Sequence, residues 1–90
     1  MKKSQDFWQK LNKPIYALAP MAGLTDSAFR RICKGFGADV LYSEMASATA
    51  LVYSPKKTLA MLKFDKMERP YIVQLFGSDS KHFIKAVKII

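Results

Sequence analysis

The sequence predicts an α/β protein with a parallel sheet, because short apolar segments and helical patterns alternate three times along its 90 residues. The apolar segments, at residues 15–19, 38–43 and 71–76, are nearly continuous rather than alternating, as in strands buried on both faces. Each segment leads through a turn into a helical pattern, which is the order of right-handed βαβ units. A doubly wound sheet and a (β/α)8 barrel both fit this order, but the first strand lacks the Gly-x-Gly-x-x-Gly turn of dinucleotide-binding sheets.

The chain before the first strand is a polar and basic lead-in, residues 1–14. Its apolar residues Phe7, Trp8 and Leu11 have the spacing of a short helix lying across the bottom of the sheet. Pro14 ends this helix, because proline removes a backbone donor. The remaining residues, 15–90, form the single domain that a chain of this length can build.

Two amphipathic helices are expected after the first and third strands. The first has an N-cap at Thr25 or Asp26, and the second has one at Asp79 or Ser80. Helical spacing predicts two buried stripes, Ala28, Phe29, Ile32, Cys33 and Phe36 on the first helix and Phe83, Ile84, Val87 and Ile90 on the second.

The connection between the second and third strands is also expected to be helical. Residues 46–53 suit a helix that breaks at Ser54-Pro55, and residues 57–62 suit a second short piece. Residues 63–70 are charged and end in proline, so we expect a solvated loop.

Composition narrows the class of protein. Fifteen Lys and Arg against seven Asp and Glu give a net charge of +8, which favours a polyanionic partner such as nucleic acid. A generally basic proteome is the alternative, since the charges form no compact patch. The single cysteine, Cys33, excludes an internal disulfide or a cysteine-based metal cluster, and no apolar run is long enough to span a membrane. We therefore expect a soluble, cytoplasmic protein without a metal.

Polar and flexible residues at the ends of the predicted strands are the candidate site. Pro20, Met21 and Ala22 form a turn that can approach a planar ligand, although an ordinary strand-to-helix turn has the same spacing. Gln74 is an amide inside an apolar strand, where its polar atoms require partners from a ligand or from neighbouring backbone.

Glu44 ends the second strand, where it either orients substrate and cofactor groups or caps the helix that starts near Ala46. Met45 and Met21 can cover a ligand or fill the core.

Cys33 lies on a helix face, which indicates a core residue rather than a nucleophile. His82 has no partner in the sequence and is expected at the surface.

Three segments carry a resemblance to a known family. Residues 19–30 (Ala-Pro-Met-Ala-Gly-Leu-Thr-Asp-Ser-Ala-Phe-Arg), 43–45 (Ser-Glu-Met) and 69–78 (Arg-Pro-Tyr-Ile-Val-Gln-Leu-Phe-Gly-Ser) are similar to motifs of the tRNA-dihydrouridine synthases. The resemblance implies that the chain is the N-terminal portion, about three βα units, of a (β/α)8 TIM barrel that binds FMN. A whole barrel takes about 250 residues, and the helix at residues 81–90 has no C-cap, so we expect a fragment.

The resemblance also implies an activity and its residues. NADPH reduces the FMN, flavin N5 delivers hydride to C6 of a uridine in tRNA, and a cysteine protonates C5. Pro20, Met21, Ala22 and Gln74 match positions that bind FMN, while Glu44 and Met45 are near flavin or substrate. The proton-donating cysteine, the phosphate site and the helical tRNA-binding domain are expected beyond Ile90, so no catalytic residue is expected in this chain.

Two other readings remain open at this point. A different FMN barrel, such as a dihydroorotate or dihydropyrimidine dehydrogenase, would act on a free pyrimidine. A basic module without enzymatic activity would bind nucleic acid by charge alone. An Asn-x-Gly-Cys-Pro-like loop after residue 90 would favour the synthase over both.

Overall fold

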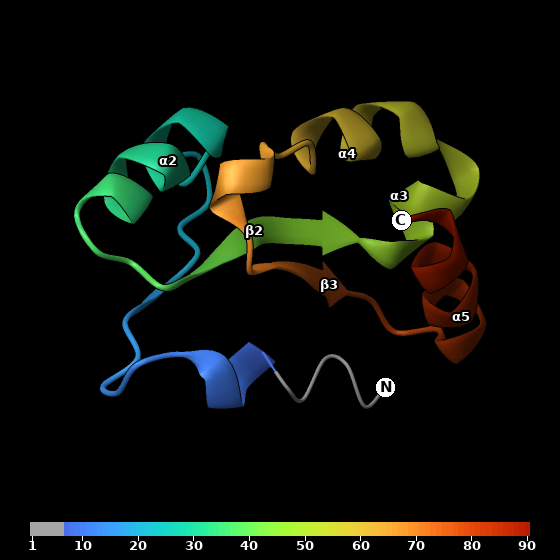
Figure 1. Cartoon of the computed structure of the whole chain (residues 1–90). Coiled ribbons are helices and arrows are strands. Elements are labelled where there is room, and N and C mark those ends of the chain that lie inside the picture. Colours follow the sequence, from blue (N-terminus) through green and yellow to red (C-terminus); the bar gives the residue numbers. More distant parts are fainter. Residues whose placement is uncertain (1–6) are drawn as a thin grey trace.

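The computed structural model describes residues 7–90, so the first six residues of the predicted lead-in lie outside the described part of the chain. Residues 7–10 form the expected short helix, in which the Phe7 and Trp8 ring centroids lie 4.6 Å apart. Figure 1 shows this helix apart from the others, on the opposite side of the strands from α2 (Ser27–Gly35) and α4 (Pro55–Met61). Within residues 7–90, no helix combines the length and the apolar character that crossing a membrane requires.

The centre of the fold is a sheet of three parallel strands in the order β1-β2-β3 (Figure 1). The strands are β1 (Ala17–Leu18), β2 (Val40–Ser47) and β3 (Tyr71–Phe76). The parallel α/β arrangement and the bounds of β3 are confirmed. β1 is shorter than the predicted residues 15–19, and β2 continues to Ser47 instead of ending at Ser43.

The helices from residue 27 onward begin where side chains cap them, except the helix that begins at Pro55. They are α2 (Ser27–Gly35), α3 (Ala48–Tyr53), α4 (Pro55–Met61), the 3₁₀ helix η1 (Lys66–Glu68) and α5 (Ser80–Ile89). Asp26 caps α2 by accepting the Phe29 amide at 2.8 Å, and Asp79 caps α5 by accepting the Lys81 amide at 2.9 Å. The predicted break at Ser54-Pro55 is confirmed, because α3 ends at Tyr53 and Pro55 opens α4.

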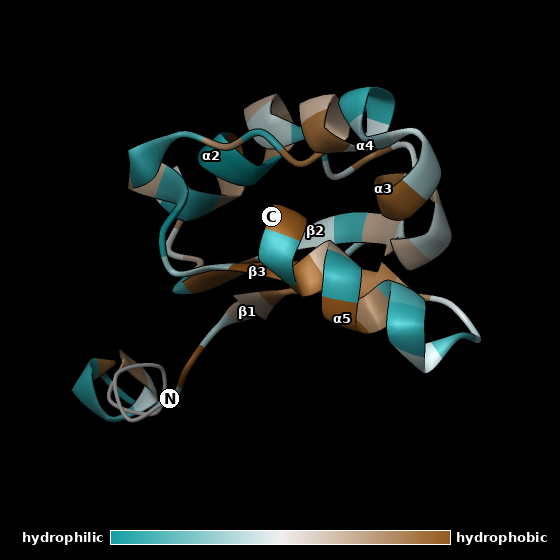
Figure 2. Ribbon diagram, turned by 90° about the vertical axis from the view of Figure 1, so that its right-hand side faces the viewer, coloured by the Kyte–Doolittle hydropathy of each residue, from teal (hydrophilic) through white to brown (hydrophobic). Residues whose placement is uncertain are grey.

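The buried core lies where α3 meets α5 beside the ends of β2 and β3. Ala48, Leu51 and Ala86 are fully buried there, and Leu75 and Phe83 pack against them. Gly77 permits this close packing: a Cβ at residue 77 would lie 3.3 Å from the Phe83 ring. Figure 2 shows that α5 carries both hydrophobic and hydrophilic residues.

The two predicted apolar stripes are only partly buried. On α2, Ile32 is 58% exposed and Phe36 is 90% exposed. On α5, Ile84 and Val87 are 60% and 61% exposed, so the prediction that these faces are covered is wrong for the described residues. The physical reason is local: α5 turns Ala86 and Phe83 toward α3, while α2 is held to the fold by the buried side chain of Arg30. 

Candidate functional site

The structure brings the predicted site residues together through two contacts between neighbouring strands. The turn after β1, which contains Pro20, Met21 and Ala22, continues into Gly23, whose backbone N–H donates a hydrogen bond to the Glu44 carboxylate. Met45 is the register partner of Gln74 across β2 and β3. The turn, the second half of β2 and the second half of β3 are therefore neighbours in the structure.

Thr25 fixes the shape of the turn. Its hydroxyl accepts a hydrogen bond from the Met21 amide at 3.0 Å and donates to the Met21 carbonyl at 3.0 Å, and its own amide bonds that carbonyl at 3.0 Å. Thr25 is fully buried, whereas the Met21 side chain and Ala22 are exposed. Gly23 adopts φ +77°, a conformation that glycine takes readily. The sequence predicts Thr25 or Asp26 as the cap of α2, and in the structure Asp26 is the cap.

Glu44 lies within β2 and does not cap a helix. Ser47 caps α3 instead, by accepting the Ala50 amide at 3.1 Å. The capping interpretation of Glu44 is therefore wrong, because β2 extends past Glu44 and moves the start of α3 to Ala48. A register irregularity between Tyr42 and Met45 accompanies this extension. Glu44 joins β2 to the turn after β1 through Gly23.

Gln74 has an unsatisfied acceptor. Within residues 7–90, its side-chain Oε1 is buried and has no hydrogen-bond partner. Its backbone is held differently: the Gln74 amide donates to Ser43 Oγ at 2.9 Å, and Ser43 is fully buried. Leaving a buried carbonyl oxygen unpaired costs about 1–3 kcal/mol. A ligand with a hydrogen-bond donor would remove that cost.

The position of Gln74 on the sheet places its side chain on the face opposite the helices. Side chains alternate along a strand, and Tyr71, Val73 and Leu75 lie on the face that carries the helices. Gln74 therefore belongs to the opposite face, next to the exposed side chain of Met45. An amide with a free acceptor beside an exposed thioether fits the edge of a planar heterocycle such as a flavin.

A buried ion pair that the sequence does not predict connects α2 with η1. Arg30 Nε and Glu68 Oε1 are 2.5 Å apart, and both side chains are buried. Glu68 also accepts hydrogen bonds from Ser27 Oγ at 2.6 Å and from the Asp65 amide at 2.7 Å. The prediction of a solvated loop at residues 63–70 is therefore wrong at Glu68. The only local signal was the Asp65-x-x-Glu68 spacing of a capping box.

The pKa of Glu68 lies below its ordinary value of 4.5. Burial by itself raises the pKa, but hydrogen bonds from Ser27, the Asp65 amide and Arg30, together with the Arg30 charge, lower it further than burial raises it. The ionised carboxylate is therefore the form that the fold stabilises.

This shift predicts an acid dependence of stability. A carboxylate whose pKa is lower in the folded state stabilises the fold fully above pH 4.5, and that stability is lost as pH falls through the folded pKa. Urea unfolding at a series of pH values from neutral downward measures the effect. The Glu68→Gln variant should show a flatter decline below pH 4.5, and an identical pH profile would contradict the assignment.

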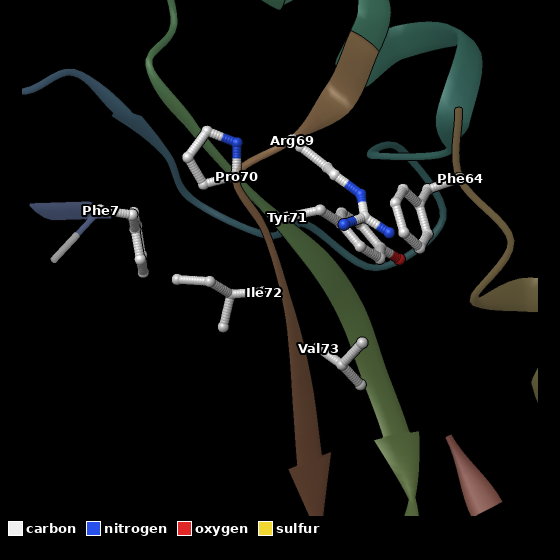
Figure 3. Close-up of a pocket in the computed structure, with 7 residues that line it drawn as sticks. All are labelled: Phe7, Phe64, Arg69, Pro70, Tyr71, Ile72 and Val73. Carbon is white, nitrogen blue, oxygen red and sulfur yellow. The ribbon is translucent and has the colours of Figure 1, made fainter. Parts of the chain in front are cut away.

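A hollow of about 550 Å³ lies at the amino-terminal half of β3 rather than beside Gln74. Figure 3 shows Phe7 and Ile72 on one side of β3, and Arg69, Phe64 and Tyr71 on the other. Phe64 stacks on Tyr71 with centroids 4.4 Å apart, and the Arg69 guanidinium lies 5.2 Å from the Phe64 ring. This hollow is lined mainly by apolar groups, and none of the predicted site residues lines it.

Cys33 and His82 lie outside the candidate site. Cys33 lies on α2 and is half-buried, so it is less enclosed than the core residue that the sequence predicts. His82 is not the unpartnered surface residue that we expected: its Nδ1 lies 2.8 Å from Thr49 Oγ1, and its ring meets the Tyr53 ring edge-on at 5.4 Å. His82 therefore connects α5 to α3. Residues 7–90 contain no group of three potential metal ligands.

Comparison with known proteins agrees with the motifs. The family model described as dihydrouridine synthase (Dus) matches residues 17–90. A probable tRNA-dihydrouridine synthase of Helicobacter pylori is 43% identical over 79 residues, covering 88% of this chain and 24% of that protein. The tRNA-dihydrouridine synthase B of Pasteurella multocida is 40% identical over 72 residues, covering 80% of this chain and 22% of the relative.

A fungal relative extends the similarity beyond bacteria. The tRNA-dihydrouridine(47) synthase [NAD(P)(+)] of Cryptococcus neoformans is 34% identical over 73 residues, covering 81% of this chain and 10% of that protein. The chain thus spans about a quarter of the length of the bacterial relatives. Because the family match covers most of the chain, including the turn, β2 and β3, the chain belongs to the dihydrouridine synthase family.

Proposed function

We propose that the protein containing this chain reduces uridine to 5,6-dihydrouridine in tRNA, with FMN as cofactor and NADPH as reductant. The names of the relatives support a tRNA substrate, and the fungal relative's name includes NAD(P)(+). The net charge of +8 also favours a polyanionic substrate. In this proposal, β1, β2 and β3 are consecutive strands of a (β/α)8 barrel, whose functional groups lie at the carboxyl ends of the strands.

The unpaired Oε1 of Gln74 is the observation that carries the flavin assignment. In the proposed site, Gln74 accepts a hydrogen bond from the flavin ring, and the turn at Pro20, Met21 and Ala22 contacts its plane. Bound reduced FMN supplies the hydride that saturates the uracil ring. Extrusion of the uridine from its stack gives access to the ring, and this chain's part is to orient the cofactor.

Glu44 and Met45 have supporting roles in this proposal. The Glu44 carboxylate holds the Gly23 amide and so keeps the turn against β2. The exposed Met45 side chain lies next to Gln74 and can cover a flat ligand without a specific shape requirement. Neither residue transfers a proton here, and the proton donor is a cysteine beyond residue 90.

Replacing Gln74 by alanine in the full-length protein should weaken FMN binding about fivefold or more, since a net hydrogen bond contributes roughly 1 kcal/mol. Gln74→Met keeps the length of the side chain but not the amide, so it should show a similar loss. Fluorescence titration of the apoprotein with FMN gives the affinity, and flavin absorbance after purification gives the occupancy.

Val73→Ala is the matched control, because Val73 lies on the helix-bearing face of the same strand. Its FMN affinity should stay close to that of the unsubstituted protein. Equal affinity and occupancy in all four proteins would overturn the role of Gln74. The activity itself is tested by incubating the full-length protein with unmodified tRNA and NADPH, and absence of dihydrouridine would contradict the proposed reaction.

A further inference from the structure

A continuous chain of buried polar contacts connects Glu68 to the turn after β1. Glu68 holds Arg30 through the 2.5 Å contact at Nε, and Arg30 Nη1 donates to the Thr25 carbonyl at 2.8 Å. Thr25 then holds both the amide and the carbonyl of Met21. Glu68, Arg30 and Thr25 are all essentially inaccessible to solvent. The chain of contacts therefore runs from η1, through α2, into the proposed cofactor site.

Arg30 is fixed from several sides, so its orientation is well determined. Nη2 donates to the Lys63 carbonyl at 3.2 Å, and the guanidinium carbon lies 4.8 Å from the centre of the Tyr71 ring. The planar guanidinium can meet these partners and Glu68 at once, which an ammonium group cannot do. A shift of Glu68 would consequently be transmitted to the Thr25 carbonyl.

We propose that Glu68, Arg30 and Thr25 are positioning residues that hold the Met21 backbone, and with it the turn at residues 20–23, in the conformation that binds the flavin. This inference rests on the proposed function. None of the three side chains needs to touch the cofactor. Their effect is to order the turn in advance, so that less conformational freedom is lost when the ligand binds.

The geometry separates this role from general stabilisation. The Thr25 hydroxyl makes both of its hydrogen bonds to one residue, Met21, within the turn. Thr25→Val keeps the shape of the side chain but removes both hydrogen bonds, while Thr25→Ser keeps the hydroxyl. Leu51 lies in the core between α3 and α5, so Leu51→Ala lowers stability without contacting the turn.

The experiment uses the full-length protein and two readouts. Hydrogen–deuterium exchange of the apoprotein, read in peptides that contain Met21, reports the order of the turn without any cofactor. Fluorescence titration with FMN reports the affinity. Thr25→Val should speed exchange at the turn and weaken FMN binding about tenfold, because part of the free energy of the two lost hydrogen bonds must be recovered when the ligand orders the turn. Glu68→Gln should act in the same direction from a distance.

The control variants complete the test. Thr25→Ser should restore slow exchange and FMN affinity, and Leu51→Ala should lower the unfolding temperature while leaving both readouts at the turn unchanged. If Thr25→Val binds FMN as tightly as the unsubstituted protein, or if Leu51→Ala loses affinity equally, the positioning role is wrong. If the unsubstituted protein does not bind FMN, the proposed function is wrong. In that case the exchange rates at Met21 still test whether Glu68, Arg30 and Thr25 order the turn.

Discussion

Replacing Glu68 by alanine is expected to lower the free energy of unfolding by about 3–5 kcal/mol, because it leaves the Arg30 guanidinium buried without its counter-charge. The Thr25 and Lys63 carbonyls would still accept hydrogen bonds from Arg30, but neither carries a charge. Urea unfolding of the full-length protein, followed by circular dichroism, measures the difference. This is the largest effect that we expect from a single substitution in the chain.

A double variant tests whether the unpaired charge is the cause. Arg30→Met combined with Glu68→Leu removes both charges and keeps most of the buried volume. Replacing a whole buried ion pair by apolar groups is often close to neutral, so the double variant should be markedly more stable than Glu68→Ala. A loss below about 1 kcal/mol for Glu68→Ala would show instead that solvent reaches the pair.

Replacing Leu51 by alanine is expected to cost about 2–5 kcal/mol, through lost burial of apolar surface and the cavity that remains. Leu51 is fully buried and packs with Ala48 and Ala86, whose small side chains cannot move in to fill the space. Thermal unfolding and urea titration of the full-length protein provide the measurement.

Ile84→Ala is the matched control for Leu51→Ala. Ile84 is a similar aliphatic residue on α5, but it is 60% exposed, and alanine favours helix. The expected change is within about 0.5 kcal/mol. Comparable losses at residues 51 and 84 would mean that the exposed face of α5 is covered in the full-length protein, and that the described core is only part of the packing.

The structural features that could be predicted from the sequence are those that local patterns determine. The bounds of β3, the break before Pro55 and the cap at Asp79 follow from apolar runs, proline chemistry and side-chain capping, all of which act within a few residues. Residues for a candidate site could also be proposed from the sequence, because strand ends carry functional groups and Gln74 is an amide in an apolar strand. Its roles in binding stay predictions.

The long-range contacts could not be predicted in the same way. Arg30 and Glu68 are 38 residues apart in the sequence. Each is a charged residue of the kind that usually lies at an exposed position of a helix or loop. Helical spacing identified an apolar face on α2 but gave no information about what covers it, and Phe36 is exposed. The sequence predicts Glu44 next to the start of a helix, whereas the structure places it within β2. The difference arises because the extension of β2 depends on pairing with β3 rather than on local propensity.

The separation of Glu68 from the turn has a consequence for the order of events during synthesis. Residues 20–23 leave the ribosome well before Glu68 does, and the Arg30 to Glu68 contact spans 38 positions. Until Glu68 is available, Arg30 has no counter-ion and cannot be buried at low cost. The hydrogen bonds between Thr25 and Met21 are local and can form early, but the Arg30 side chain reaches its buried position against the Thr25 carbonyl only after the segment that precedes β3 has been translated and has docked onto α2.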